Sequence, residues 1–236
     1  MSDPTPLRGY RKPYPGSQPP RSAVEAYGRW MRGPGTDPIA IPVTLSEVTG
    51  PSINRITLGE HAADLTAGFP GQPQGERIIV SGRVLDENGR PVRNTVVEVW
   101  QCNAAGRYLH KGDQHDAPLD PNFTGTGQVL TDDHGRYRFT TIKPGAYPWR
   151  NHFNAWRPAH IHFSLHGEGI GQRLVTQMYF PGDPLLAFDP IYNCVDDDKA
   201  RARMVSSFDW ENTENEFALG YRFDIVLRGR KMTVWE

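Results

Sequence analysis

The chain has 236 residues, enough to bury a sizeable core in one large domain or in two small ones. Its 26 basic and 27 acidic side chains give a net charge of −1, which argues against a nucleic-acid or membrane-surface partner. No apolar stretch reaches the length of a membrane span, and residues 1–20 lack the apolar core of a secretion signal. We therefore expect a cytoplasmic protein that binds small molecules or other proteins.

The chain contains two cysteines, too few for a disulfide framework, and we expect both to be small buried hydrophobic residues. A thiolate ligand at Cys102 is the alternative. The 24 glycines and 21 prolines favour many short strands joined by loops.

Residues 1–75 are predicted to form an N-terminal arm and an irregular segment that contact a partner subunit. Eight prolines lie among residues 1–40, which excludes a regular helix or a central strand there. Tyr27 and Trp30 lie in the same stretch, and aromatic residues are rare in disordered tails, so an extended arm on another surface is expected. A short helix is predicted around residues 60–65.

Residues 76–236 are predicted to form a β-sandwich catalytic domain. Apolar and β-branched runs predict strands over residues 77–85, 95–101, 160–165, 174–180 and 221–228. Within residues 131–142 a turn at residues 132–135 is followed by a further predicted strand, in which Tyr137 and Phe139 alternate with arginines. A turn centred on Asn88-Gly89 favours a hairpin in which the second strand returns along the first. The predicted fold is mainly β, an antiparallel sandwich with an extended N-terminal arm and long loops. One surface helix is expected within residues 196–208.

The strand that begins at His160 carries two histidines. Because successive strand side chains point to opposite faces, His160 and His162 project together while Ile161 projects the other way. Two adjacent imidazoles can supply half of a metal's coordination sphere. The alternative is an ordinary half-buried strand whose polar face meets water.

Two tyrosines, Tyr108 and Tyr147, stand beside glycine or proline, where a bent backbone can aim a side chain into a pocket. Either one alone could be a packing residue with a hydrogen-bonded hydroxyl. Two phenolates together with two imidazoles suit trivalent iron better than zinc or copper(I). The other histidines lack a partner at ligand spacing and are expected to be exposed or locally hydrogen bonded: His61, His110, His115, His134, His152 and His166.

The sequence around these residues resembles the intradiol aromatic-ring dioxygenases. The resemblance runs from about residue 45 to the C-terminus and includes five stretches: residues 75–80, 119–123, 147–151, 156–163 and 221–229. Within the family it is strongest to the beta chains of enzymes built from two homologous chains.

The resemblance implies a non-haem Fe(III) and a set of site residues. The metal ligands would be Tyr108, Tyr147, His160 and His162, with a solvent hydroxide as the fifth ligand. Arg157 matches an arginine close to the substrate ring, and Gln177 matches a residue near the hydroxide and oxygen site. Positions that contact the substrate or form the pocket wall are matched by Tyr27, Trp149 and Ile191.

The resemblance also implies that the enzyme inserts both atoms of O2 into protocatechuate, giving 3-carboxy-cis,cis-muconate in aromatic-compound degradation by the beta-ketoadipate pathway. Tyr147 would be both ligand and base, and a homologous alpha chain would complete the pocket in an alpha-beta hetero-oligomer. Another catechol or hydroxyquinol is the alternative substrate, and a β-sandwich binding module without catalysis is the alternative function. A cupin-type metal enzyme fits less well, because Glu168 is six residues beyond His162 and no histidine follows His166.

Overall fold

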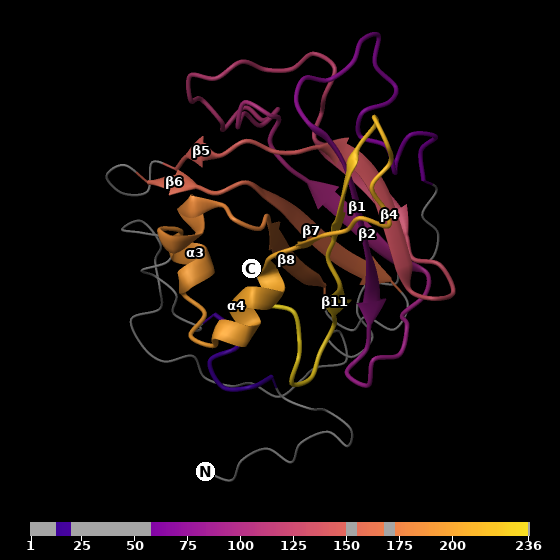
Figure 1. The fold of residues 1–236 in the computed structure, drawn as a ribbon, viewed down its shortest axis with the longest axis vertical. Coiled ribbons are helices and arrows are strands. Elements are labelled where there is room, and N and C mark those ends of the chain that lie inside the picture. The colour runs from indigo at the N-terminus through magenta and orange to yellow at the C-terminus, as the bar shows by residue number, and fades with distance from the viewer. Residues whose placement is uncertain (1–12, 20–57, 150–154, 168–172, 236) are drawn as a thin grey trace.

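The computed structural model describes residues 13–19, 58–149, 155–167 and 173–235 (Figure 1). Most of the predicted arm, with Tyr27 and Trp30, lies outside the described residues, as does His152. Among the residues described, no helix is both long and apolar enough to cross a membrane.

Two β-sheets make up the framework. The first contains β1 (Arg77–Leu85), β4 (Arg136–Ile142), β9 (Ser207–Phe208), β10 (Leu219–Arg222) and β11 (Ile225–Val226). The second has the strand order β3-β2-β7-β8, with β2 (Thr95–Trp100), β3 (Thr126–Leu130), β7 (His160–Gly167) and β8 (Leu174–Tyr179). A further pair joins β5 (Tyr147–Pro148) to β6 (Trp156–Arg157).

The expected mainly β, largely antiparallel sandwich is confirmed. All pairings within the second sheet are antiparallel, and so are those of β1 with β4 and of β10 with β9. Local pattern does not indicate that β1 also pairs in parallel with β10 and β11. The predicted strand over residues 221–228 is divided into β10 and β11. Between them the Asp224 carboxylate takes the place of a backbone acceptor and binds the Arg83 N–H at 2.9 Å.

The predicted hairpin is wrong, although its turn forms. The Asp86 carboxylate accepts from the backbone N–H groups of Asn88 and Arg90, at 2.8 and 2.9 Å. The chain then leaves the first sheet, and β2 pairs with β3 and β7 in the second. Both edges of β1 are occupied by β4 on one side and by β10 and β11 on the other, so β2 has no place beside it.

Of the two helix predictions, the first is wrong and the second is confirmed over a shorter range. Residues 60–66 form turns, and Leu65 donates its N–H to the Thr140 carbonyl of β4 at 2.9 Å, so this segment extends the sheet edge. Within residues 196–208 only α4 (Asp198–Met204) is helical, since Val205 is extended and bridges Tyr179. Two short helices, η1 (Pro184–Ala187) and α3 (Pro190–Asn193), precede it, and η1 contacts β6.

The hydrophobic core lies between the two sheets. Ile78 and Phe139 enter it from the first sheet, and Ile161 and Phe163 of β7 enter it from the second. Because β7 turns its apolar residues inward, its histidines lie on the outer face of the second sheet. The candidate site is therefore built on the outside of the sandwich and not within its core.

Candidate metal centre

His160 and His162 are adjacent on the outer face of β7. Their ring centroids are 4.9 Å apart, and their residues are only 1% and 8% exposed. His160 Nδ1 lies 2.7 Å from the Pro158 carbonyl, which can only accept, so Nδ1 carries the proton. The lone pair of Nε2 is therefore free to bind a metal, and a backbone carbonyl fixes the orientation of the ring.

The two tyrosines meet these histidines from outside the sheet. Tyr147 is in β5, and its hydroxyl lies 3.3 Å from Nε2 of His160. Tyr108 lies in the loop after β2, and its ring meets that of Tyr147 edge to face, with centroids 5.4 Å apart. The Tyr108 ring is also 6.4 Å from that of His162. The structure thus brings all four predicted ligand side chains together.

The protonation of this group is set by burial. Burial raises the pKa of Tyr108 well above its usual value, and the neighbouring Tyr147 raises it further. Burial likewise raises the pKa of Tyr147 and lowers that of His160 well below its usual value. All three side chains are therefore neutral in the protein alone, and a cation placed among them would favour release of the phenol protons.

A donor set of two phenol oxygens and two imidazole nitrogens fits trivalent iron better than zinc or copper(I). The Tyr108 hydroxyl is buried and makes no hydrogen bond to any described residue, as expected for an atom reserved for a ligand. No group of three or more His, Cys, Asp or Glu side chains placed to hold a metal occurs among the described residues, so any metal here needs the tyrosines. Burial raises the pKa of the Cys102 thiol to about 12, which argues against a thiolate ligand.

Arg157 of β6 lies next to this group and is itself buried, at 3% exposure. Its guanidinium donates to the Asp189 carboxylate at 3.2 Å, to Oε1 of Gln177 at 2.5 Å and to the Tyr179 hydroxyl at 3.1 Å. It also lies 5.5 Å from the ring centre of Trp149. These contacts hold the cation in one place, and the wholly buried Asp189 balances its charge.

Gln177 is bonded directly to Arg157, and Ile191 is connected to Arg157 through Asp189. Gln177 lies opposite His162 in the register of β7 with β8, and its Nε2 is buried without a hydrogen-bond partner among the described residues. Ile191 is buried in α3, where its N–H binds the second oxygen of Asp189 at 3.0 Å. Sequence reasoning missed Asp189 and Tyr179, since the only local signal at Asp189 is that of a helix start before Pro190.

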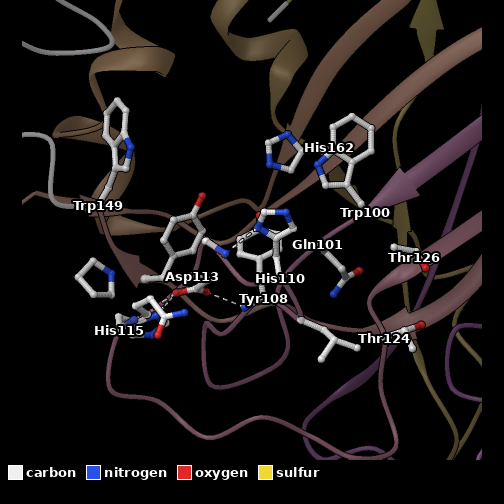
Figure 2. Close-up of a pocket in the computed structure, with 15 residues that line it drawn as sticks. Trp100, Gln101, Tyr108, His110, Asp113, His115, Thr124, Thr126, Trp149 and His162 are labelled. Atoms are coloured by element: carbon white, nitrogen blue, oxygen red, sulfur yellow. Dashed lines mark hydrogen bonds and ion pairs between the residues drawn. The ribbon is translucent and has the colours of Figure 1, made fainter. Parts of the chain in front are cut away.

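A pocket of about 670 Å³ opens beside the rings of Tyr108, Tyr147 and His162, and His160 does not line it. Its lining includes Trp100, Tyr108, His110, Tyr147, Trp149 and His162, whereas Arg157, Gln177 and Ile191 do not line it. Figure 2 shows Trp149 and Trp100 on opposite sides of this pocket. Trp100 is stacked flat on His162, with ring centroids 4.8 Å apart. Trp100 faces His162 directly in the register of β2 with β7, and sequence reasoning missed it because this pairing joins strands far apart in the chain.

Two further histidines also lie at this pocket, His110 and His115. His110 accepts from the Gly112 N–H at 3.1 Å, and His115 donates to the Asp113 carboxylate at 2.9 Å. Both are locally hydrogen bonded, as expected, and neither belongs to the four-ring group.

Comparison with known proteins identifies the family. The sequence model of the family described as Dioxygenase matches residues 48–229. The protocatechuate 3,4-dioxygenase beta chain of Burkholderia cepacia is 61% identical over 207 residues, which cover 87% of this chain and 88% of that protein. The protocatechuate 3,4-dioxygenase alpha chain of Pseudomonas putida is 30% identical over 205 residues, covering 83% of this chain and 96% of that one.

A solved structure supports the same relationship. The 3-chlorocatechol 1,2-dioxygenase of Rhodococcus opacus 1CP superposes with a TM-score of 0.56 at 25% identity, covering 72% of this chain and 65% of that chain. The family match spans most of the sequence, and the four converging rings lie within it. The chain is therefore an oxidoreductase that belongs to the intradiol dioxygenase family.

Proposed function

We propose that the chain is the iron-bearing subunit of an enzyme that inserts both atoms of O2 into protocatechuate and so yields 3-carboxy-cis,cis-muconate. The observation that carries the proposal is the convergence of two half-buried tyrosines and two buried histidines beside a pocket. The choice of substrate is supported by 61% identity to a protocatechuate 3,4-dioxygenase beta chain. Another catechol or hydroxyquinol remains the alternative.

In this proposal Fe(III) is held by the hydroxyl oxygens of Tyr108 and Tyr147 and by one ring nitrogen each of His160 and His162. Bound there, the ion supplies a Lewis acid that lowers the pKa of the two substrate hydroxyls and binds their oxygens. Tyr147 receives one of the substrate protons. Its phenol could hold that proton, because burial raises its pKa.

Arg157 is proposed to stabilise negative charge on the substrate ring. Its position is fixed by Asp189 and Tyr179, so no reorganisation is needed as the charge develops. The side-chain NH2 group of Gln177 has no partner among the described residues, which suits a donor to an oxygen atom near the metal. Trp149 lines the pocket, and Ile191 is proposed to support its wall from behind.

A second chain is proposed to complete the pocket. None of the described residues that line it is a lysine or an arginine, although the substrate carries a carboxylate. A homologous alpha chain would supply a cationic group and would contact the segment of residues 1–75, including Tyr27, while residues 76–236 form the catalytic domain. The expected cytoplasmic location stays a prediction.

The test is the visible absorption spectrum of the chain, co-produced with a homologous alpha chain and supplied with iron. We expect a broad red-brown band from phenolate-to-Fe(III) charge transfer, which shifts when protocatechuate is added without oxygen. When O2 is then admitted, the protein should consume one equivalent of O2 and give the ring-opened product. A colourless protein that binds zinc or no metal would instead favour the binding-module interpretation.

The Tyr108→Phe variant tests one proposed ligand. It should lose the band and the activity together, because the variant keeps the ring but removes the donor oxygen. Tyr221→Phe is the matched control, since Tyr221 is a buried tyrosine of the first sheet and should leave both unchanged. Retention of colour and activity by Tyr108→Phe would remove Tyr108 from the ligand set.

A further inference from the structure

The loop that carries Tyr108 and the loop that carries Tyr147 are bonded directly to each other. The carbonyl oxygen of Asn103 accepts from Gly106 N–H in its own loop and from Gly145 N–H in the other, both at 3.0 Å. The Cys102 thiol adds a bond to the Gly145 carbonyl at 3.3 Å. The two tyrosines are therefore connected by a short series of covalent and hydrogen bonds that does not include a strand of either main sheet.

Asn103 also fixes the turn that immediately precedes Tyr108. Its side-chain oxygen accepts from the N–H groups of Ala105 and Arg107 at 3.0 and 2.9 Å, while its backbone N–H donates to the Arg107 carbonyl at 2.9 Å. Its side-chain amide donates to the Pro118 carbonyl at 2.9 Å. A single buried residue thus closes one loop and holds the other.

The two loops approach so closely that only glycine fits at the contact. A Cβ on Gly106 would lie 2.3 Å from the Ala146 carbonyl oxygen, and a Cβ on Gly145 would lie 2.4 Å from the Ala104 carbonyl oxygen. Gly106 also has a φ of +79°, in the left-handed region. We call this contact of residues 103–107 with residues 144–147 the loop interlock.

We propose that the loop interlock sets the spacing of the Tyr108 and Tyr147 hydroxyls, with Asn103, Gly106 and Gly145 as positioning residues for the metal centre. This rests on the proposed function, because the two phenols are its metal ligands. The Tyr108 hydroxyl makes no hydrogen bond to a described residue, so its position depends on the backbone that carries it. Metal–ligand distances tolerate only a few tenths of an ångström, so a small separation of the loops weakens binding.

The first experiment compares Gly145→Ala with Gly59→Ala. Neither glycine has a left-handed φ, and an added Cβ at Gly59 meets nothing within 4 Å, so only the first variant forces the loops apart. We expect Gly145→Ala to bind Fe(III) about tenfold more weakly in a chelator competition, in line with other changes behind a metal ligand, and to shift its visible band. Gly59→Ala should match the parent protein in both.

A second pair of variants keeps the test decisive if Gly145→Ala does not fold. Asn103→Ala removes the acceptor for Ala105 and Arg107, whereas Asn103→Asp keeps that acceptor and loses only the donor to Pro118. Asn103→Asp also places a charged oxygen opposite the Pro118 carbonyl. We expect Asn103→Ala to weaken iron binding more than Asn103→Asp does. Equal loss in both would show that the acceptor in the turn does not decide iron binding, and would overturn the role given to Asn103.

Amide hydrogen exchange in the metal-free protein separates this proposal from the proposed function. Exchange in residues 144–147 should be faster in Gly145→Ala and in Asn103→Ala than in the parent, because the bonds between the loops are weakened. If the parent protein binds no iron, the proposed function fails while exchange still reports on the interlock. Unchanged exchange, iron affinity and visible band in the two variants would overturn the interlock.

Discussion

Arg157, for which we propose a catalytic role, also has a structural one, because its buried side chain is bonded to Asp189. Its charge is balanced by Asp189, whose other oxygen binds the Ile191 N–H at the start of α3. Removing one partner of a buried ion pair leaves an uncompensated charge, which costs far more than loss of an exposed pair. The effect of a substitution at Arg157 on stability must therefore be separated from its effect on turnover.

Comparison of Arg157→Ala with Arg157→Ala/Asp189→Asn makes this separation. We expect the single variant to lose about 3–5 kcal/mol of unfolding free energy, because Asp189 stays buried without its partner. The double variant should recover part of that stability, since an asparagine side chain is uncharged and still caps α3. Turnover should fall strongly in both variants with little change in iron content. Denaturant unfolding measures the stability, oxygen uptake the turnover and iron analysis the metal content. Recovery of turnover in the double variant would contradict a direct role for Arg157 in catalysis.

Among the strands, the break between β10 and β11 is held from inside the core. The Tyr137 hydroxyl of β4 donates to the Phe223 carbonyl, and the Phe223 N–H donates to the Ser81 carbonyl of β1 at 2.8 Å. A Cβ on Gly82 would lie 1.9 Å from the same Phe223 oxygen, so glycine is required there. Strands β1 and β4 are thus both bonded to Phe223, the residue that follows β10.

This arrangement predicts a pH-dependent effect of Tyr137→Phe. Burial, with a smaller contribution from Asp224, raises the pKa of Tyr137 well above the value of about 10 expected in the unfolded chain. The stability that depends on the neutral phenol is therefore complete below about pH 10 and is lost as the pH rises above it. We expect Tyr137→Phe to cost about 1–3 kcal/mol at neutral pH, because the Phe223 carbonyl loses its partner.

The difference in unfolding free energy between the parent and Tyr137→Phe should shrink above about pH 10, as measured by denaturant unfolding at several pH values. Tyr14→Phe is the control, because Tyr14 is 48% exposed and its variant should follow the parent at every pH. A difference that stays constant through the alkaline range would contradict the burial of a neutral phenol at Tyr137.

Across the molecule as a whole, the core and the candidate metal centre occupy opposite faces of the second sheet. Phe139 of β4 packs in the core, with its ring centroid 6.0 Å from that of Phe163 in β7. The site side of β7 is covered instead by the loops that carry the tyrosines and by the Arg157 network. Stability and metal binding should therefore respond separately to substitutions in the two regions.

Phe139→Ala should lose about 3–5 kcal/mol of unfolding free energy, because it removes a large side chain from the centre of the core. The fraction that remains folded should keep the visible band of the parent. Phe188→Ala is the control, since Phe188 is 75% exposed and its loss should change stability by less than about 0.5 kcal/mol. A shifted band in folded Phe139→Ala would show that core packing and the metal centre are coupled.

The sequence pattern within a segment predicts the structure of that segment wherever no distant contact is needed to form it. The alternation of His160, Ile161 and His162 predicts which face each side chain takes, and β7 begins at His160 as expected. Strand β1 has the predicted limits. Strand β3 is not predicted because Gly127 interrupts its pattern, although glycine is needed there to admit Leu65, whose Cδ1 would lie 2.4 Å from a Cβ.

Residues close together in the chain are enough to establish the fold class, the family resemblance and the faces of the strands, since each depends on short-range patterns or motifs. The folded chain alone shows that β2 leaves β1 for the other sheet, that Asp189 balances the charge of Arg157, and that the two loops before the tyrosines meet closely at Gly106 and Gly145. These features are contacts between residues far apart in the sequence. Such contacts depend on which strand edges are already occupied and on which buried charges need a partner, and both are settled only when the whole chain has packed.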